Sequence, residues 1–251
     1  MEKYNNATES DGSLFSFWIA PGDEEAKVLL QGFEGMFNQV LKQYDIFLAE
    51  RVEDLNEQTI SMDFRVFGSP EEMAAITSGD NFPDFQCTVK SDACHSNKCE
   101  VDLAYKSLLT GTEHQTIIIQ EKNSLIYILE DLISSIIFPG LIGFDYADFS
   151  RMLSNSSNII AHCTFADDYN QDRKLFESNK DDKHNIVVLF SFSNRNTNIS
   201  IEKVSHWSTL NCDEHFFEIV FYSCILRNRG HEPDRRSIFI GRDIGGNDGH
   251  L

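Results

Sequence analysis

Two aspartates, Asp145 and Asp148, follow a Pro139-Gly140 pair that interrupts an apolar stretch ending at Phe138. Proline and glycine are strong signals for the end of a helix, so a loop and then a new helix are expected here. Residues three apart lie on one face of a helix, which places both carboxylates on one side of its first turn. Acids in this position often cap a helix. Asp145 is then the N-cap, and Asp148 complements the positive end of the helix dipole.

The residues around these acids resemble the synergy loop of FtsZ, the bacterial relative of tubulin, which runs Pro-Gly-Leu-Ile-Asn-x-Asp-Phe-Ala-Asp-Val. The residues identical to that pattern are Pro139, Gly140, Leu141, Ile142, Asp145, Ala147 and Asp148, and Tyr146 and Phe149 are conservative replacements. The departure is Gly143, where the family has asparagine, so one polar contact to a neighbouring pocket is lost.

In the FtsZ family this loop of one subunit enters the nucleotide pocket of the next, and its acids help to orient the attacking water. The resemblance implies that Asp145 and Asp148 act only in trans, on the nucleotide of a partner. It also implies an interaction loop made of Pro139, Gly140, Leu141, Ile142, Gly143, Phe144 and Tyr146. We refer to residues 139–148 as the acid-bearing loop.

A GTPase of this family also needs a glycine-rich phosphate loop before its central helix, because only glycine lets the backbone N–H groups approach the phosphates closely. No such run precedes residue 123, and the only glycine pair is Gly245-Gly246, within a tail. The sequence therefore predicts no bound nucleotide and no cofactor.

A second group with chemical potential consists of Cys87, Cys94, His95 and Cys99. Three thiolates and one imidazole could form a tetrahedral zinc shell. Their spacing fits no known zinc knuckle, and burial in the core explains Cys87 equally well because it lies in an alternating strand pattern. Zinc is thus an alternative, and the main prediction is that no metal is bound. The neighbours His162 and Cys163 are expected to be a buried core pair, and Trp207 to pack on a sheet.

The elements that position these residues indicate an α/β protein, with α+β as the alternative. The predicted division is a flexible tail (1–12), an N-terminal α/β unit (13–115), a central helix region (116–138), an FtsZ-like activation domain with a mixed sheet and packed helices (139–244), and a flexible tail (245–251). The N-terminal unit could be a degenerate nucleotide domain. Alternation predicts its strands, and a regular apolar stripe predicts a helix over residues 23–44.

The resemblance to FtsZ extends over residues 123–244, about half of the chain. Apolar residues of the segment 125–137 surround well over half of a helix, so this central helix should be buried on most sides. A helix is expected over 146–154, and a strand buried on both faces over 186–192. The charged segment 167–183 is expected to be solvated.

Composition excludes some classes of function. The 251 residues are 41% hydrophobic with a formal net charge of −19, so binding to a nucleic acid is not expected because phosphate backbones require clustered Lys and Arg. No stretch of 18 uncharged apolar residues occurs, so membrane insertion is not expected either. Six scattered cysteines and the absence of a basic leader favour the cytoplasm.

These observations favour an FtsZ-like interaction protein, without its own phosphate loop, that caps or regulates a tubulin-like polymer of the cytoskeleton or of cell division. Such a pseudo-GTPase would not be an enzyme alone, although its acids could activate GTP hydrolysis by a partner. Its partner would be a protein, either an FtsZ-like GTPase or a second copy. The alternatives are a self-assembling structural protein of the same descent, a highly divergent GTPase, and a zinc hydrolase.

Overall fold

The protein is described by a computed structural model that covers residues 15–20, 47–48, 62–67, 85–90, 97–107, 111–137, 140–165, 172–175, 183–193, 197–211, 216–227 and 233–245. Its strands are β1 (Phe15–Ala20), β2 (Phe47–Leu48), β3 (Met62–Phe67), β4 (Phe85–Lys90), β5 (Cys99–Ser107), β6 (Gly111–Ile119), β7 (Ser156–Phe165), β8 (His184–Ser193), β9 (Phe217–Arg227) and β10 (Arg235–Asp243). Its helices are the 3-10 turn η3 (Lys122–Ser124), α3 (Leu125–Ile137), α4 (Tyr146–Ser154) and α6 (Thr197–Asn211).

The described strands form one mixed sheet in the order β2-β1-β3-β4-β5-β6-β7-β10-β8-β9. Parallel pairs join β1, β2, β3 and β4, and also β6 with β7 and β8 with β9, whereas the other neighbours are antiparallel. β10 lies between β7 and β8, which precede it in the chain. The α/β class with a mixed sheet and packed helices is therefore confirmed. The division predicted between residues 115 and 116 falls within β6, and the sheet continues across it.

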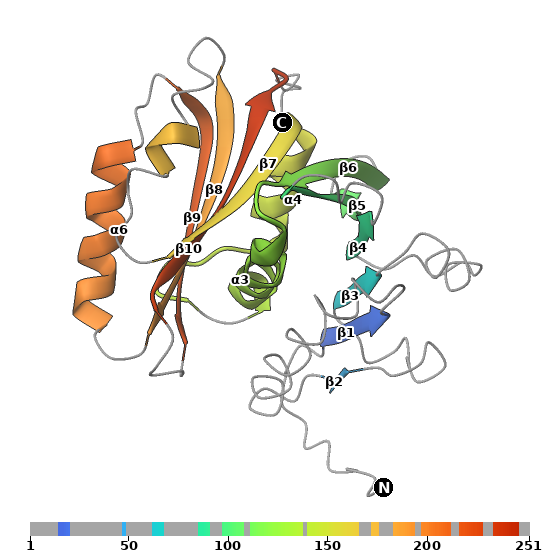
Figure 1. The fold of residues 1–251 in the computed structure, drawn as a ribbon, viewed down its shortest axis with the longest axis horizontal. Helices are drawn as coiled ribbons and strands as arrows, with labels where there is room; N and C mark the ends of the chain where they lie inside the picture. Colours follow the sequence, from blue (N-terminus) through green and yellow to red (C-terminus); the bar gives the residue numbers. More distant parts are fainter. Residues whose placement is uncertain are drawn as a thin grey trace, which may run out of the picture.

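Helices cover both faces of the C-terminal part of the sheet. Helices α3 and α4 lie on one side of β7, β10 and β8, and α6 lies on the other side, against β8 and β9 (Figure 1). Alternating side chains of a strand point to opposite faces, so each of these strands contributes to two separate cores. For this reason the strand β8 reads as a continuous apolar run. Its first nine residues are all buried, as the sequence predicts.

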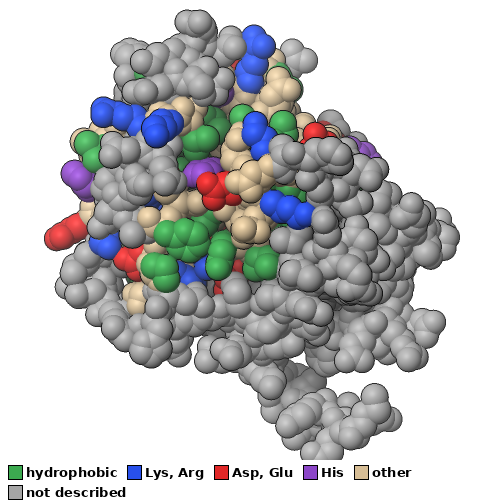
Figure 2. Space-filling view, in the orientation of Figure 1, with side chains coloured by type: hydrophobic (Ala, Val, Ile, Leu, Met, Phe, Trp, Pro, Cys, Tyr) green, Lys and Arg blue, Asp and Glu red, His purple; other side chains and the backbone are tan. Residues whose placement is uncertain are grey.

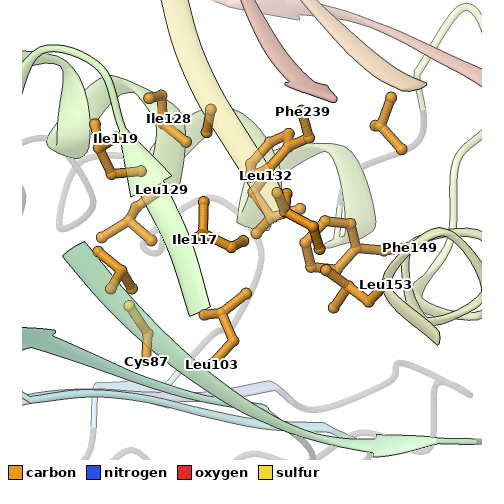
Figure 3. Close-up of a cluster of buried hydrophobic side chains, with 14 of the residues drawn as sticks. Cys87, Leu103, Ile117, Ile119, Ile128, Leu129, Leu132, Phe149, Leu153 and Phe239 are labelled. Carbon is orange, nitrogen blue, oxygen red and sulfur yellow. The ribbon is translucent and has the colours of Figure 1, made fainter. Parts of the chain in front are cut away.

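The larger core lies under α3 and α4 (Figure 3). It joins Cys87 and Leu103 of the N-terminal strands to Leu132 of α3 and to Phe149 and Leu153 of α4, all of which are almost inaccessible to solvent. Phe149 packs edge-on against Phe239 of β10, with 5.4 Å between ring centroids. One cluster thus joins residues from β4 to β10.

The second core lies under α6 and is built around Trp207, which is fully buried. Its ring meets that of Phe190 of β8 edge-on at 5.6 Å. The predicted packing of Trp207 on the sheet is confirmed. Burial of a large aromatic side chain is worth roughly 3 kcal/mol or more by transfer free energy, so this contact fixes α6 on the sheet.

Several predicted elements coincide with the structure. The helix expected over 146–154 is α4, and the apolar helix expected over 125–137 is α3, whose residues 128–135 are all buried. The strand β6 (Gly111–Ile119) leads into the turn η3, which precedes α3. The helix predicted over 23–44 and both predicted tails up to residue 12 and beyond residue 245 lie outside the described residues.

On the face shown in Figure 2, hydrophobic, basic and acidic side chains of the described residues are interspersed, and no single kind covers it. Among the described helices, none has the length and apolar character that crossing a membrane requires.

Candidate functional site

The two acids form a reciprocal capping box at the start of α4. Asp145 is the N-cap in an extended conformation, and its Oδ1 accepts a hydrogen bond from the Asp148 backbone N–H at 2.9 Å. In return, the Asp148 Oδ2 accepts one from the Asp145 backbone N–H at 3.3 Å. The N-cap prediction for Asp145 is confirmed. Asp148 does more than complement the helix dipole, because its side chain closes the box.

The remaining carboxylate oxygens face different surroundings. Asp145 is exposed, and within the described part of the chain its Oδ2 takes part in no hydrogen bond. Asp148 is half-buried, and this burial raises the pKa of its carboxyl group, as does the charge of Asp145, while its hydrogen bond to the Asp145 N–H and the charge of Arg151 act to lower it. Asp145 is thus the acid that a partner molecule could contact directly.

The loop before the capping box is fixed to the edge of the sheet. The Leu141 backbone N–H donates to the Cys224 carbonyl oxygen of β9 at 2.7 Å, and the Cys224 N–H donates to the Ile142 carbonyl oxygen at 3.4 Å. At Gly140, a Cβ atom would lie 2.6 Å from the Cys224 carbonyl oxygen, so only glycine fits there. The loop is held by its backbone, and Leu141 remains 42% exposed.

The predicted interaction loop divides into buried and exposed residues. Phe144 is buried, and its ring packs edge-on against those of Phe149 and Phe221 at 6.4 and 6.3 Å. Gly143 is exposed, with no atom within 4 Å of where its Cβ would be. The accessible surface of the acid-bearing loop therefore consists mainly of Leu141, Gly143 and Asp145. Pro139 lies outside the described residues.

The other end of α4 is held by side chains of β6. Glu113 Oε2 accepts hydrogen bonds from the hydroxyl groups of Tyr105 at 2.6 Å and Ser154 at 2.9 Å. Gln115 Nε2 donates to the carbonyl oxygens of Leu153 and Ser156 at 3.3 and 3.2 Å. The bond to Leu153 joins the last turn of α4 to β6, and the bond to Ser156 joins β6 to the start of β7. Helix α4 is thereby fixed at both ends.

A buried ionic cluster ties α3 to β10, and the sequence reasoning did not foresee it. Arg235 donates from Nε to the Asp131 oxygens at 3.0 and 3.1 Å and from Nη2 to Asp131 Oδ1 at 2.7 Å, and it also pairs with Glu130. Burial alone would lower the pKa of Arg235, but these two acids outweigh it and raise that pKa. The available sequence signal was a pair of acids inside an otherwise apolar helix, matched by the adjacent Arg235 and Arg236.

A second buried network lies on the opposite face of the sheet. Asp172, in the helical segment 172–175, accepts hydrogen bonds from Trp207 Nε1 at 2.7 Å and Arg236 Nε at 2.9 Å, and also from the Thr164 hydroxyl. The expectation that the charged segment 167–183 is solvated is thus wrong at Asp172, which is fully buried. The reason is that its carboxylate has three donors, which offset the cost of burial.

The cysteines are not arranged as a metal site in the described part of the chain. Cys87 and Cys99 are buried in the core, and burial, together with Cys99 and Asp102, raises the pKa of the Cys87 thiol. Among the described residues, no group of three or more His, Cys, Asp or Glu side chains could hold a metal ion. Cys94 and His95 lie outside the described residues, so the zinc alternative is still to be tested by metal analysis of the purified protein.

The pair His162 and Cys163 lies in β7, and both residues are buried, as predicted. They point to opposite faces of the sheet because they are consecutive in a strand. Burial, together with the charge of Asp131, raises the pKa of Cys163 to about 12. A protonated thiol on the far side of a sheet from the imidazole cannot act as an activated nucleophile.

Comparison with known proteins gives only structural similarities. No protein-family model matches the sequence, and no curated protein does. Among solved structures, the chain is similar to a point mutant of FtsZ from M. jannaschii (14% identity, TM-score 0.37, 89% of this chain and 54% of that chain). It is also similar to an empty FtsZ dimer from the same organism (14% identity, TM-score 0.37, 93% of this chain and 55% of that chain). The chain spans about half the length of these FtsZ chains.

Proposed function

We propose that this chain is an FtsZ-like interaction protein that presents its acid-bearing loop to a tubulin-like polymer and thereby caps or regulates it. The observation that carries the proposal is a loop of FtsZ-like sequence, fixed by its backbone to β9 and ending in a solvent-facing Asp145. A loop fixed before binding loses little conformational entropy when it docks, which favours its use as a contact surface.

A capping role follows from the combination of features in the sequence. In the FtsZ family, each subunit offers its loop to one neighbour and its nucleotide pocket to the other. A chain that has the loop but no phosphate-binding glycine run can occupy one end of a polymer, and the next subunit then finds no nucleotide pocket to enter. Asp145 and Asp148 would act on the nucleotide of the terminal subunit.

The experiment is to mix the protein with an FtsZ-type GTPase and to record light scattering and GTP turnover. The expected result is shorter or fewer polymers at substoichiometric amounts, with altered turnover per subunit. The informative variant is Asp145→Asn, because asparagine caps a helix as well as aspartate does but carries no charge. It should keep the thermal stability of the protein and lose the effect on the polymer.

A matched control removes an acid elsewhere. Glu202 is exposed on α6, on the opposite side of the sheet from α4, so Glu202→Gln should retain the full effect on the polymer. The proposal fails if the unmodified protein changes neither scattering nor turnover at stoichiometric amounts.

The capping box favours one other candidate, a structural protein that assembles with itself. In that case Asp145 and Asp148 only stabilise α4, as their reciprocal hydrogen bonds allow. Sedimentation at increasing protein concentration separates the two candidates. Assembly of the protein alone, unaffected by Asp145→Asn, would favour the structural one.

A further inference from the structure

Helix α3 is buried on nearly all sides, so apolar contacts alone do not select one position of the helix on the sheet. Residues 128–135 are buried without interruption, and the helix contacts β7, β8, β9 and β10. Apolar contacts are non-directional, so an apolar helix can pack against an apolar sheet after a small rotation and translation at limited cost. Something other than apolar burial must then select one register.

The buried ionic cluster has the directionality that apolar contacts lack. Arg235 is 1% exposed, and its guanidinium makes three hydrogen bonds of 2.7 to 3.1 Å to both oxygens of Asp131, which is 0% exposed. Glu130 pairs with the same guanidinium, and the Ser237 hydroxyl donates to Asp131 Oδ2 at 2.6 Å. The Tyr127 ring lies 4.9 Å from the Arg235 Cζ. Three residues within little more than one turn of α3 thus contact two residues of β10.

A shift of one residue along α3 would break this cluster. It corresponds to a rotation of about 100° and a rise of about 1.5 Å, which would turn Asp131 away from the guanidinium. The result would be an uncompensated buried charge, which is strongly destabilising. The cluster therefore favours the observed register, because only there do Glu130 and Asp131 both contact Arg235.

The register of α3 also decides where the acid-bearing loop begins. Only two residues separate Ile137, the end of α3, from Gly140, which lies against β9. Three peptide units span at most about 11 Å, so a displaced helix end would pull on the hydrogen bond between Leu141 and Cys224. We infer that Arg235, through Glu130 and Asp131, is a positioning residue that fixes the acid-bearing loop in its docking geometry. The functional meaning of this geometry rests on the function proposed above.

The neighbouring residue offers a matched control. Arg236 is also buried and also pairs with a buried acid, Asp172, but on the opposite face of the sheet and away from α3. Neutralising that pair removes the same kind of interaction from the same strand. It should not displace the loop.

The test uses the full chain labelled with ¹⁵N. The first variant replaces the cluster by apolar residues of similar size, Glu130→Leu, Asp131→Leu and Arg235→Met, because such replacements commonly preserve folding. The control variant carries Asp172→Asn and Arg236→Gln. Amide hydrogen exchange is measured at Leu141, which donates to β9, and at Val188 in β8, a strand that is paired on both sides.

The expected result is that the cluster variant keeps the protection of Val188 within threefold and loses at least tenfold at Leu141, whereas the control variant keeps both. Unchanged protection of Leu141 in a folded cluster variant would overturn the inference. If the cluster variant does not fold, the variant Arg235→Lys is used, because lysine keeps the charge but not the bidentate contact. Arg235→Lys should then show the same selective loss of protection at Leu141, and unchanged protection at Leu141 would overturn the inference.

These readouts need no partner protein, so they separate the inference from the proposed function. Loss of protection at Leu141 without any effect of the unmodified protein on a polymer would reject only the proposed function. An effect on the polymer that persists in the cluster variant, with Leu141 still protected, would reject only the inference.

Discussion

Gly140 and Gly143 lie three residues apart in one loop, yet alanine should have opposite effects at the two positions. Neither glycine has a φ in the left-handed region, so the difference depends on space alone. A Cβ at Gly140 would lie 2.6 Å from the Cys224 carbonyl oxygen and 3.0 Å from that of Ile142, whereas a Cβ at Gly143 would meet nothing within 4 Å.

The magnitudes follow from these distances. Gly140→Ala forces the loop away from β9, which costs the hydrogen bonds that join Leu141 and Ile142 to Cys224, at about 0.5–1.5 kcal/mol each. Strain from overpacking adds about 1–3 kcal/mol, so a total loss of about 2–6 kcal/mol is expected. Gly143→Ala should instead stabilise the fold by about 0.4–1 kcal/mol, because alanine restricts the unfolded chain.

Urea unfolding followed by circular dichroism measures both variants against the parent protein, provided that the slope with denaturant is unchanged. A thermal scan should show the Gly140→Ala midpoint lower by about 4–24 °C, from roughly 2–4 °C per kcal/mol for a chain of this size. If both variants unfold at the same urea concentration, the close contact between Gly140 and β9 does not exist, and the anchored loop must be abandoned.

Three further predictions concern single groups. Asp145→Ala should lower the free energy of unfolding by about 0.5–2 kcal/mol, as measured in urea, whereas Asp145→Asn should leave it nearly unchanged. The raised pKa of Asp148 means that the folded state holds this proton more tightly than the unfolded one, so its ionisation lowers stability as the pH rises from its ordinary value of 3.8 through the raised pKa. Asp148→Asn should remove that part of the pH dependence from unfolding curves between pH 3 and 6. Finally, Cys87, Cys99, Cys163 and Cys224 are buried, so of the six cysteines at most two should react rapidly with a thiol reagent before unfolding, and all six in denaturant.

Local signals in the sequence were sufficient for much of the C-terminal fold. The Pro-Gly pair and the spaced acids located α4 with its actual ends, because both signals act within one helical turn. The apolar run from Ile186 to Phe192 identified a doubly buried strand, because burial on both faces removes all need for polar residues.

Contacts between distant residues could not be read in the same way. Asp131 and Arg235 are 104 positions apart, and nothing in either neighbourhood indicates which charge meets which. Asp172 looked like one of many acids in a solvated segment, and only the fold brings Thr164, Trp207 and Arg236 around it. For the acid-bearing loop, the sequence indicated which acids could do chemistry, but the burial of Phe144 depends on its packing against Phe149 of α4 and Phe221 of β9.

The position of β10 has a consequence for how the chain assembles. β10 is the last of the described strands to leave the ribosome, yet it separates β7 from β8, and it supplies Arg235 and Arg236, the arginines that pair with Asp131 and Asp172. Until it is synthesised, the β6–β7 pair and the β8–β9 pair cannot join into one sheet. Glu130 and Asp131 of α3 also lack Arg235, with which they pair in the folded protein. Pairings across such long separations close slowly. The nascent protein should therefore contain two incomplete sheets until residues 235–243 are synthesised and join them into one. The exposed strand edges of these sheets should bind chaperones during that time.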